Sequence, residues 1–280
     1  MFATLLKYEF RRTKNVLLPI NLGALLIGSF GYFLMFILLK ITESSNSELM
    51  ILSPLIMILW YCLFFMLTLL STAVTIILCL QFYREKFTDQ GYLTFTLPVS
   101  THQILLSSYT NFLIWSVVNV LVTLVAFGLM FTPIISSAIR GINDLGLDLA
   151  YLWAIIKEEY ATIVPNSVLM IVSYSLMMIT SLFYGISLPY LSITLACSWV
   201  KKGKLLLAVG IGYGLTVIMN IITIVISIIE GIVTGVLLYE SVSYYAFGSI
   251  SLIIVSVLYI GFTIGGYFLM HHLVKNKLNL

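Results

Sequence analysis

Charge is scarce in this sequence: Asp, Glu, Lys and Arg make up 9% of its 280 residues, and hydrophobic residues make up 61%. An average soluble domain carries roughly 25% charged residues. The composition therefore excludes an ordinary soluble protein. The formal net charge of +3 is too small to indicate a nucleic-acid-binding surface, so we expect no nucleic-acid partner.

The sequence also lacks recognisable motifs for nucleotide binding, metal binding or catalysis. The sequence contains no GxxxxGK[ST] motif, so the chain by itself has no P-loop to hold the phosphates of a nucleotide. His271 and His272 are neighbours that point in different directions on a helix, and no third metal ligand accompanies them. We predict no catalytic residue, no metal site and no cofactor bound by this chain. The three cysteines lack a CxxC spacing and are predicted to be small core residues: Cys62, Cys79 and Cys197.

Six long apolar runs take the place of charge. Each is close to or above the roughly 20 residues that cross the hydrocarbon core of a bilayer, and they cover residues 16–39, 55–80, 105–131, 167–188, 205–229 and 247–269. Because lipid offers the backbone no hydrogen-bond partner, continuous runs of this length are helices rather than barrel strands. We therefore predict an all-α, polytopic integral membrane protein with six transmembrane helices in a single domain, residues 1–280.

The distribution of basic residues predicts the orientation. Lys and Arg gather in the N-terminal segment, in the second and fourth connections and at the C-terminus, whereas Lys40, Arg140 and Lys157 fall on the other side. Cytoplasmic loops carry the excess of Lys and Arg, so both termini are predicted to be cytoplasmic. The longest connection, residues 132–166, is then an outer interfacial loop, and we expect within it a helix on the membrane surface that stops before Pro165.

Polar side chains recur at helical spacing inside several spans. In the fifth span, steps of three and four residues place six of them on one face: Tyr213, Thr216, Asn220, Thr223, Ser227 and Glu230. The second span carries a similar set: Thr68, Ser71, Thr72 and Thr75. So does the third span: Asn111, Trp115, Asn119 and Thr123.

Polar groups that face lipid are costly, so such stripes either bond to neighbouring helices or line a wet path. Both readings stay open for the third span. For the fifth span we favour a path lining, to which the second span would add Thr68, Thr72 and Thr75. Glu230 could meet a cationic substrate there, or it could lie in interfacial water without a role.

Glycine pairs at GxxxG spacing predict where helices approach each other closely. Such pairs are Gly231 with Gly235 and Gly261 with Gly265. We expect each pair to lie at a helix contact.

The segment QFYREKFTDQGYLTFTLPVS, residues 81–100, concentrates charge beside aromatic residues. The charges need water while the aromatic rings need a surface to bury against, so we expect a short helix lying under the membrane. Gly91 suits a left-handed turn that ends this helix, and Ser100 with Gln103 forms a capping box that starts the third span. Exposed aromatic residues beside charges are typical of a docking surface for another protein.

Two stretches resemble a known family. KYEFRR before the first span and QFYREKFTDQGYLTFTLPVS between the second and third are similar to the permease subunits of bacterial type-2 ABC exporters, especially those of Firmicutes. The resemblance covers the whole chain in topology and is specific in residues 82–100. It implies that this cytoplasmic segment is the coupling helix, which sits in a cleft of a separate ATPase subunit and transmits nucleotide-driven closure to the spans. It also implies that helices two and five line the path at a dimer seam.

Carried onto this sequence, the resemblance gives one set of ATPase-coupling residues: Phe82, Tyr83, Arg84, Glu85, Lys86, Phe87, Asp89, Gly91 and Tyr92. Within the set, the three charged residues of the REK run, together with Phe87 and Asp89, would engage the ATPase. Gly91 and Tyr92 would fix the bend that follows.

The resemblance implies a permease subunit in the bacterial cytoplasmic membrane that moves an amphiphilic substrate outward, such as an antimicrobial peptide, a lipid or a drug. The implied partners are an ATP-binding cassette ATPase with its own ATP and Mg, a second permease chain, identical or related, and the lipid bilayer. The alternative is a secondary transporter or channel that needs no ATPase. Such a protein normally carries ionisable residues at mid-membrane, and the six spans have none there.

Overall fold

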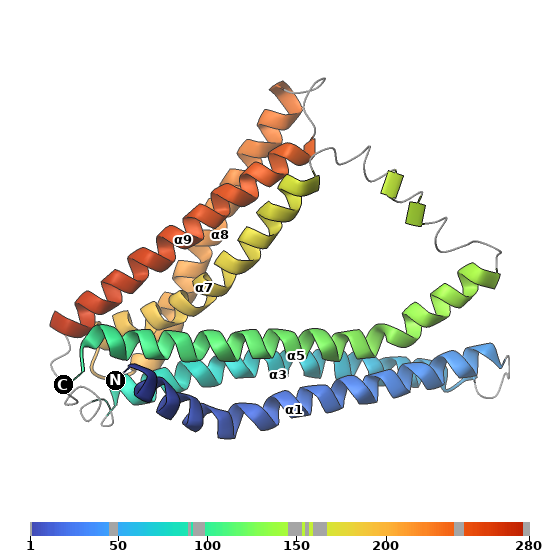
Figure 1. Cartoon of the computed structure of the whole chain (residues 1–280), viewed down its shortest axis with the longest axis horizontal. Helices are drawn as coiled ribbons and strands as arrows, with labels where there is room; N and C mark the ends of the chain where they lie inside the picture. The colour runs from blue at the N-terminus through green and yellow to red at the C-terminus, as the bar shows by residue number, and fades with distance from the viewer. Residues whose placement is uncertain are drawn as a thin grey trace. The chain divides into compact units, whose positions relative to one another are not determined.

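The structure is a computed structural model, and it describes residues 2–44, 50–88, 91, 99–144, 153–154, 157–158, 167–237 and 244–276. Six long helices make up most of these residues: α1 (Phe2–Glu43), α3 (Ser53–Phe87), α5 (Thr101–Asp144), α7 (Ser167–Trp199), α8 (Lys204–Leu237) and α9 (Tyr244–Asn276) (Figure 1). All six are long and apolar enough to cross a membrane. Each predicted span lies inside one helix, so the predicted all-α class with six transmembrane helices is confirmed. The cytoplasmic placement of the termini stays a prediction.

The helices extend beyond the apolar runs because hydropathy marks only the part that suits lipid. The largest difference is in α5, which continues through Pro133 to Asp144. The prediction of an outer loop from residue 132 is therefore wrong for residues 132–144. Hydroxyl groups near the proline donate to backbone carbonyls of the same helix, Thr132 to Gly128 O (2.6 Å) and Ser136 to Pro133 O (2.9 Å). Most of the surface helix expected before Pro165 lies outside the described residues.

The chain divides into two compact units. Unit 1 comprises Met1–Leu5, Cys79–Leu113 and Glu158–Leu280, and it therefore contains α7, α8 and α9 with the end of α3 and the start of α5. Unit 2 comprises Leu6–Leu78 and Ile114–Lys157, which cover most of α1, α3 and α5. α3 and α5 thus contribute residues to both units.

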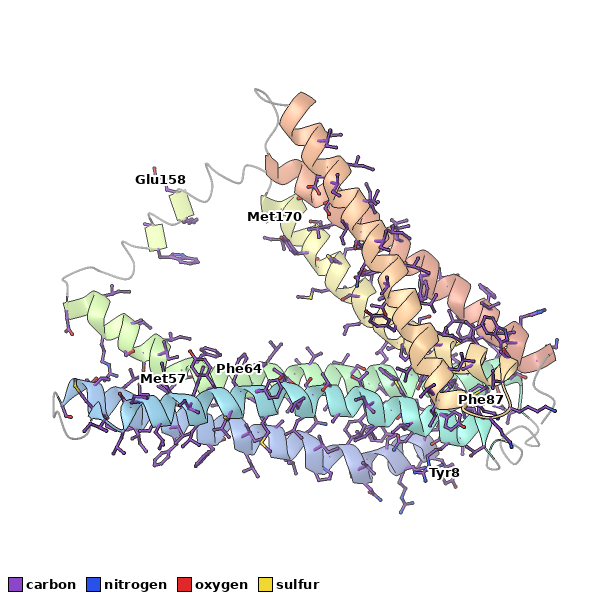
Figure 2. All side chains as sticks on the ribbon, turned by 180° about the vertical axis from the view of Figure 1, so that it is seen from behind. Tyr8, Met57, Phe64, Phe87, Glu158 and Met170 are labelled. Carbon is purple, nitrogen blue, oxygen red and sulfur yellow. The ribbon has the colours of Figure 1, made fainter. Side chains whose placement is uncertain are left out.

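The core of unit 2 lies where α1, α3 and α5 pack side by side (Figure 1). Trp60 of α3 contacts Phe131 of α5 edge-on, with ring centroids 5.3 Å apart. The ring centroid of Phe64, a residue labelled in Figure 2, lies 5.1 Å from the ring centroid of Phe127. Gly28 of α1 allows a close approach to α5, since a Cβ atom there would lie 2.8 Å from the backbone of Ala126.

Side-chain hydrogen bonds cross the helices of unit 2, besides an ion pair of 3.9 Å between Arg140 of α5 and Glu43 of α1. The indole of Trp115 donates to the hydroxyl of Thr13 over 2.9 Å. The amide of Asn119 donates to the hydroxyl of Ser71 over 2.9 Å. At Trp115 and Asn119 the polar stripe of the third span therefore bonds to neighbouring helices, as one of its two interpretations predicted.

In unit 1, α7 contacts both α8 and α9. Tyr184 of α7 stacks on Tyr259 of α9 at 4.4 Å. Glycines bring the helices together here too, because a Cβ at Gly266 of α9 would lie 3.0 Å from the hydroxyl of Ser187. Among the described residues no atom lies within 4 Å of such a Cβ at Gly231, Gly261 or Gly265, so these glycines mark no close approach between helices within the described part of the chain. The surroundings of Gly235 lie outside the described residues.

The cysteines are all free: Cys62, Cys79 and Cys197. Cys62 is exposed and the other two are half-buried. The prediction of three core cysteines is therefore wrong for Cys62, which the spans of this chain leave uncovered.

Gly28→Ala should destabilise unit 2, because the added methyl group must displace the backbone of α5. Overpacking of this kind costs about 1–3 kcal/mol. Thermal unfolding of the purified chain in detergent measures the effect. Gly23→Ala on the same helix is the matched control: no atom lies within 4 Å of its Cβ, so the helix propensity of Ala should leave stability equal or slightly higher. Equal melting of both variants would contradict the close α1–α5 contact.

Candidate functional site

The end of α3 joins a group of packed aromatic rings that we call the aromatic cluster. Its members come from α3, α5, α7 and α9, and all belong to unit 1: Phe82, Phe87, Tyr109, Phe112, Tyr190 and Tyr267. The cluster is the place where the predicted coupling segment meets the membrane helices.

The contact between Phe82 and Tyr190 is the tightest of the cluster. The two rings stack with centroids 3.7 Å apart and an interplanar angle of 11°. Phe82 is 2% exposed and Tyr190 is 3% exposed. Phe87, one and a half turns further on, packs edge-on against Phe82 at 5.7 Å. The last turns of α3 are therefore anchored on α7 by stacked aromatic surface, an arrangement that adds to ordinary apolar burial.

Tyr190 also connects α7 to α5. Its hydroxyl donates to the backbone carbonyl of Ser108 over 3.4 Å, and its ring meets Tyr109 and Phe112 edge-on at 5.2 and 5.4 Å. A buried tyrosine hydroxyl needs such a partner because leaving it unpaired away from water is costly. One ring thus contacts α3 and α5 at the same time.

Tyr109 extends the cluster to α9. Its hydroxyl lies 3.4 Å from the hydroxyl of Ser187 and 3.8 Å from the sulfur of Met270. Its ring meets Tyr267 of α9 edge-on at 5.6 Å. Four helices are therefore joined through contacts of aromatic rings, and a displacement of the α3 end must either move its neighbours or break the packing.

The side chains of the coupling segment fall into two groups. Phe82, Phe87 and Lys86 are buried, Lys86 being 2% exposed. Arg84 is exposed, and Tyr83 and Glu85 are half-buried. Contact of the segment with an ATPase stays a prediction. Arg84 is exposed, whereas Phe82 and Phe87 are packed in the aromatic cluster. Asp89 and Tyr92 lie outside the described residues.

The segment that starts at residue 82 does not form the separate short helix that we expected, because it continues α3. α3 runs without a break from Ser53 to Phe87, because the aromatic residues that we expected to seek the membrane surface are buried within the chain. The hydroxyl of Thr88 then donates to the carbonyl of Arg84, and the amide of Gly91 to the carbonyl of Thr88 over 2.7 Å.

Gly91 is needed for a different reason from the one predicted. Among the described glycines the positive φ angle belongs to Gly203, at 73°, so the prediction of a left-handed turn at Gly91 is wrong. Instead, a Cβ at Gly91 would lie 2.5 Å from the carbonyl oxygen of Lys86. The chain turns so closely on the end of α3 that no larger residue fits without a shift.

The Ser100 half of the capping box predicted at the start of α5 is confirmed, and the return bond from the Gln103 side chain stays a prediction. The carbonyl of Ser100 accepts from the amides of Gln103 (2.9 Å) and Ile104 (3.2 Å). The hydroxyl of Ser100 accepts a longer bond from the Gln103 amide, at 3.4 Å. Ser100 is therefore the N-cap of α5, which fixes where the connection from α3 ends.

The polar stripe of α8 lies on a sparsely covered helix. Tyr213 is 74% exposed, and Asn220 and Ser227 are exposed too. Several hydroxyls of the stripe donate to carbonyls of their own helix: Thr216 to Gly212, Thr223 to Asn220 and Ser227 to Thr223. Thr68 and Thr72 of α3 do the same. The hydroxyls are thus satisfied locally, and their assignment to a path stays a prediction.

Sequence reasoning missed the tyrosines of the aromatic cluster. Tyr109 and Tyr190 lie inside apolar spans, and each needs a hydrogen-bond partner for its hydroxyl. The need for a partner could have identified these tyrosines from the sequence, since it predicts that a tyrosine within a span contacts a neighbouring helix.

Within the described residues no group of three or more His, Cys, Asp or Glu side chains converges to hold a metal ion. Comparisons with protein-family models, with curated proteins and with solved structures return no match for this chain.

Phe82→Ala should loosen the end of α3, because it removes the ring that stacks on Tyr190. Truncation of a buried phenylalanine costs about 3–5 kcal/mol, and thermal unfolding in detergent measures it. Leu80→Ala, two residues earlier and 40% exposed, is the control and should cost far less. If both variants melted alike, the stack would not anchor α3.

Proposed function

We propose that the chain is the transmembrane permease subunit of an ATP-binding cassette exporter, driven by a separate ATPase subunit. The six apolar helices are compatible with a subunit of a membrane transporter. The observation that carries the proposal is the difference in burial at the end of α3. Phe82 is buried in the aromatic cluster, while Arg84 is exposed two residues later. A segment that receives force from a partner needs both a firm anchor and a surface to be pushed.

The proposed transmission runs through the aromatic cluster. Closure of the ATPase on nucleotide displaces the segment that begins at Arg84. The displacement passes from Phe82 to Tyr190 on α7, and from there to Tyr109 on α5. Close-packed rings transmit such a shift because they do not deform gradually.

The substrate path in this proposal lies along α8. Its exposed polar residues, Tyr213 and Asn220 among them, are not covered by α7 or α9 of unit 1, and polar groups in that position favour a partner helix or water over lipid. A second permease chain, identical or related, supplies that partner and completes the path. Hydroxyl, amide and aromatic groups suit an amphiphilic substrate such as a peptide, a lipid or a drug.

Co-purification tests the proposal. The chain is tagged at its C-terminus, native membranes are solubilised gently, and proteins present in near-equal amount are identified by mass spectrometry. We expect a P-loop ATPase. Arg84→Glu should reduce its recovery about tenfold or more, since reversal of a charge at a docking surface weakens binding on that scale, while unfolding of the permease stays within about 0.5 kcal/mol of the original.

Arg11→Glu is the matched control, because Arg11 is an exposed arginine on the same predicted side of the membrane. It should leave recovery of the ATPase unchanged. A preparation that transports without any ATPase would overturn the proposal in favour of a carrier or channel. Equal loss in both variants would show that net charge, and not the coupling segment, holds the ATPase.

A further inference from the structure

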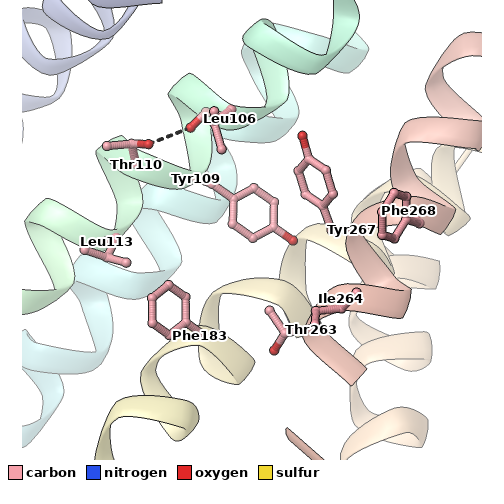
Figure 3. A pocket seen from close by; sticks show the side chains of 9 residues that line it. All are labelled: Leu106, Tyr109, Thr110, Leu113, Phe183, Thr263, Ile264, Tyr267 and Phe268. Atoms are coloured by element: carbon pink, nitrogen blue, oxygen red, sulfur yellow. Dashed lines mark hydrogen bonds between the residues drawn. The ribbon is translucent and has the colours of Figure 1, made fainter. Parts of the chain in front are cut away.

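An apolar groove of about 350 Å³ lies within unit 1, between α5, α7 and α9 (Figure 3). Five apolar side chains form its walls: Leu106 and Leu113 of α5, Phe183 of α7, and Ile264 and Phe268 of α9. The groove is half-open rather than enclosed. It is separate from the polar face of α8 and from the exposed side of the coupling segment.

The groove runs along the helices. Its lining on α5 extends from Leu106 to Leu113, which at a helical rise of about 1.5 Å per residue corresponds to roughly 10 Å. A half-open, apolar groove of this length suits part of a straight hydrocarbon chain.

One end of the groove is polar. The hydroxyl of Tyr267, a lining residue, pairs with Nδ1 of His102, and the rings of His102 and His271 lie 6.2 Å apart. When Tyr267 donates to Nδ1, the proton of the neutral imidazole is on Nε2, which can donate to another acceptor. Hydrogen-bond donors therefore gather at the end that continues from Leu106 towards the start of α5.

The same end favours negative charge. α5 has no acidic residue in its first turn, and Lys275 lies in the last turn of α9, one turn after His271. The first turn of α5 contributes partial positive charge and the last turn of α9 partial negative charge, so Lys275 supplies the net positive charge at this end. An ammonium group would be repelled by Lys275 and would find no carboxylate in either of these two turns.

We propose that this groove binds one acyl chain of an anionic phospholipid, whose phosphate lies at the end marked by His102, His271 and Lys275. The apolar walls take the chain and the donors take the phosphate. A zwitterionic lipid offers the same chain but brings a cation to the basic end. The site is thus a selective one for negatively charged lipid, independent of the ATPase and of the transported substrate.

Native mass spectrometry of the full chain tests the proposal. The chain is reconstituted in nanodiscs that contain equal amounts of phosphatidylglycerol and phosphatidylcholine, and the lipids retained after gentle release are counted. We expect one retained phosphatidylglycerol in preference to phosphatidylcholine. Lys275→Gln should lower this preference about fivefold, the effect of one basic residue near a membrane surface, whereas Lys14→Gln on the exposed part of α1 should not change it.

Leu113→Trp should abolish retention by filling the groove. Leu121→Trp is the matched control on the same helix, since Leu121 is 58% exposed and lies outside the groove. Thr263→Phe fills the same groove from α9 and replaces Leu113→Trp if that variant does not elute as a monodisperse protein. Retention that survives the groove variants, or equal retention of both lipids, would mean annular lipid only and would overturn the proposal.

Discussion

Lipid neither donates nor accepts hydrogen bonds, and this constraint decides where the polar groups of the six helices are placed. The backbone meets it by forming uninterrupted helices. Many hydroxyls meet it on their own helix, as Thr72 does on the carbonyl of Leu69 over 2.9 Å. Groups that cannot reach their own backbone bond across helices, as Asn119 does with Ser71. The buried hydrogen bonds between helices thus follow from the side chains that could not be satisfied locally.

Whether a polar side chain bonds to its own helix or to a neighbour decides how strongly a polar stripe indicates a wet path. A serine or threonine in a span satisfies its hydroxyl on a carbonyl three or four residues earlier, so its presence says little about a wet path. An amide or a phenol has more to satisfy or reaches further from the helix. On α8 the informative residues are therefore Asn220 and Tyr213, both exposed, more than the hydroxyls between them.

The number and type of the helices could be predicted from the sequence because apolar runs near the thickness of a bilayer have few alternatives. The N-cap at Ser100 could also be predicted, since capping depends on a local pattern. Long-range contacts could not. Glycine spacing suggested contacts at Gly261 and Gly265, while the close approach is at Gly266, because the approach depends on which face a neighbouring helix covers. Gly203 adopts the positive φ that was expected at Gly91, and its position among lysines concealed it. For the candidate site, the segment was found from its charges, but the stacking of Phe82 required knowledge of α7.

The aromatic cluster joins parts of the chain that are far apart in sequence, and this has a consequence for biosynthesis. Tyr109 and its partner Met270 are separated by 161 residues. At a synthesis rate of about 5–20 residues per second, roughly 10–30 s pass between the two. Within this interval Tyr190 of α7, which stacks on Phe82, is made before Tyr267 of α9, which contacts Tyr109. The aromatic cluster is therefore complete only when the last helix has been made, and a chain truncated before α9 lacks the contact between Tyr109 and Tyr267.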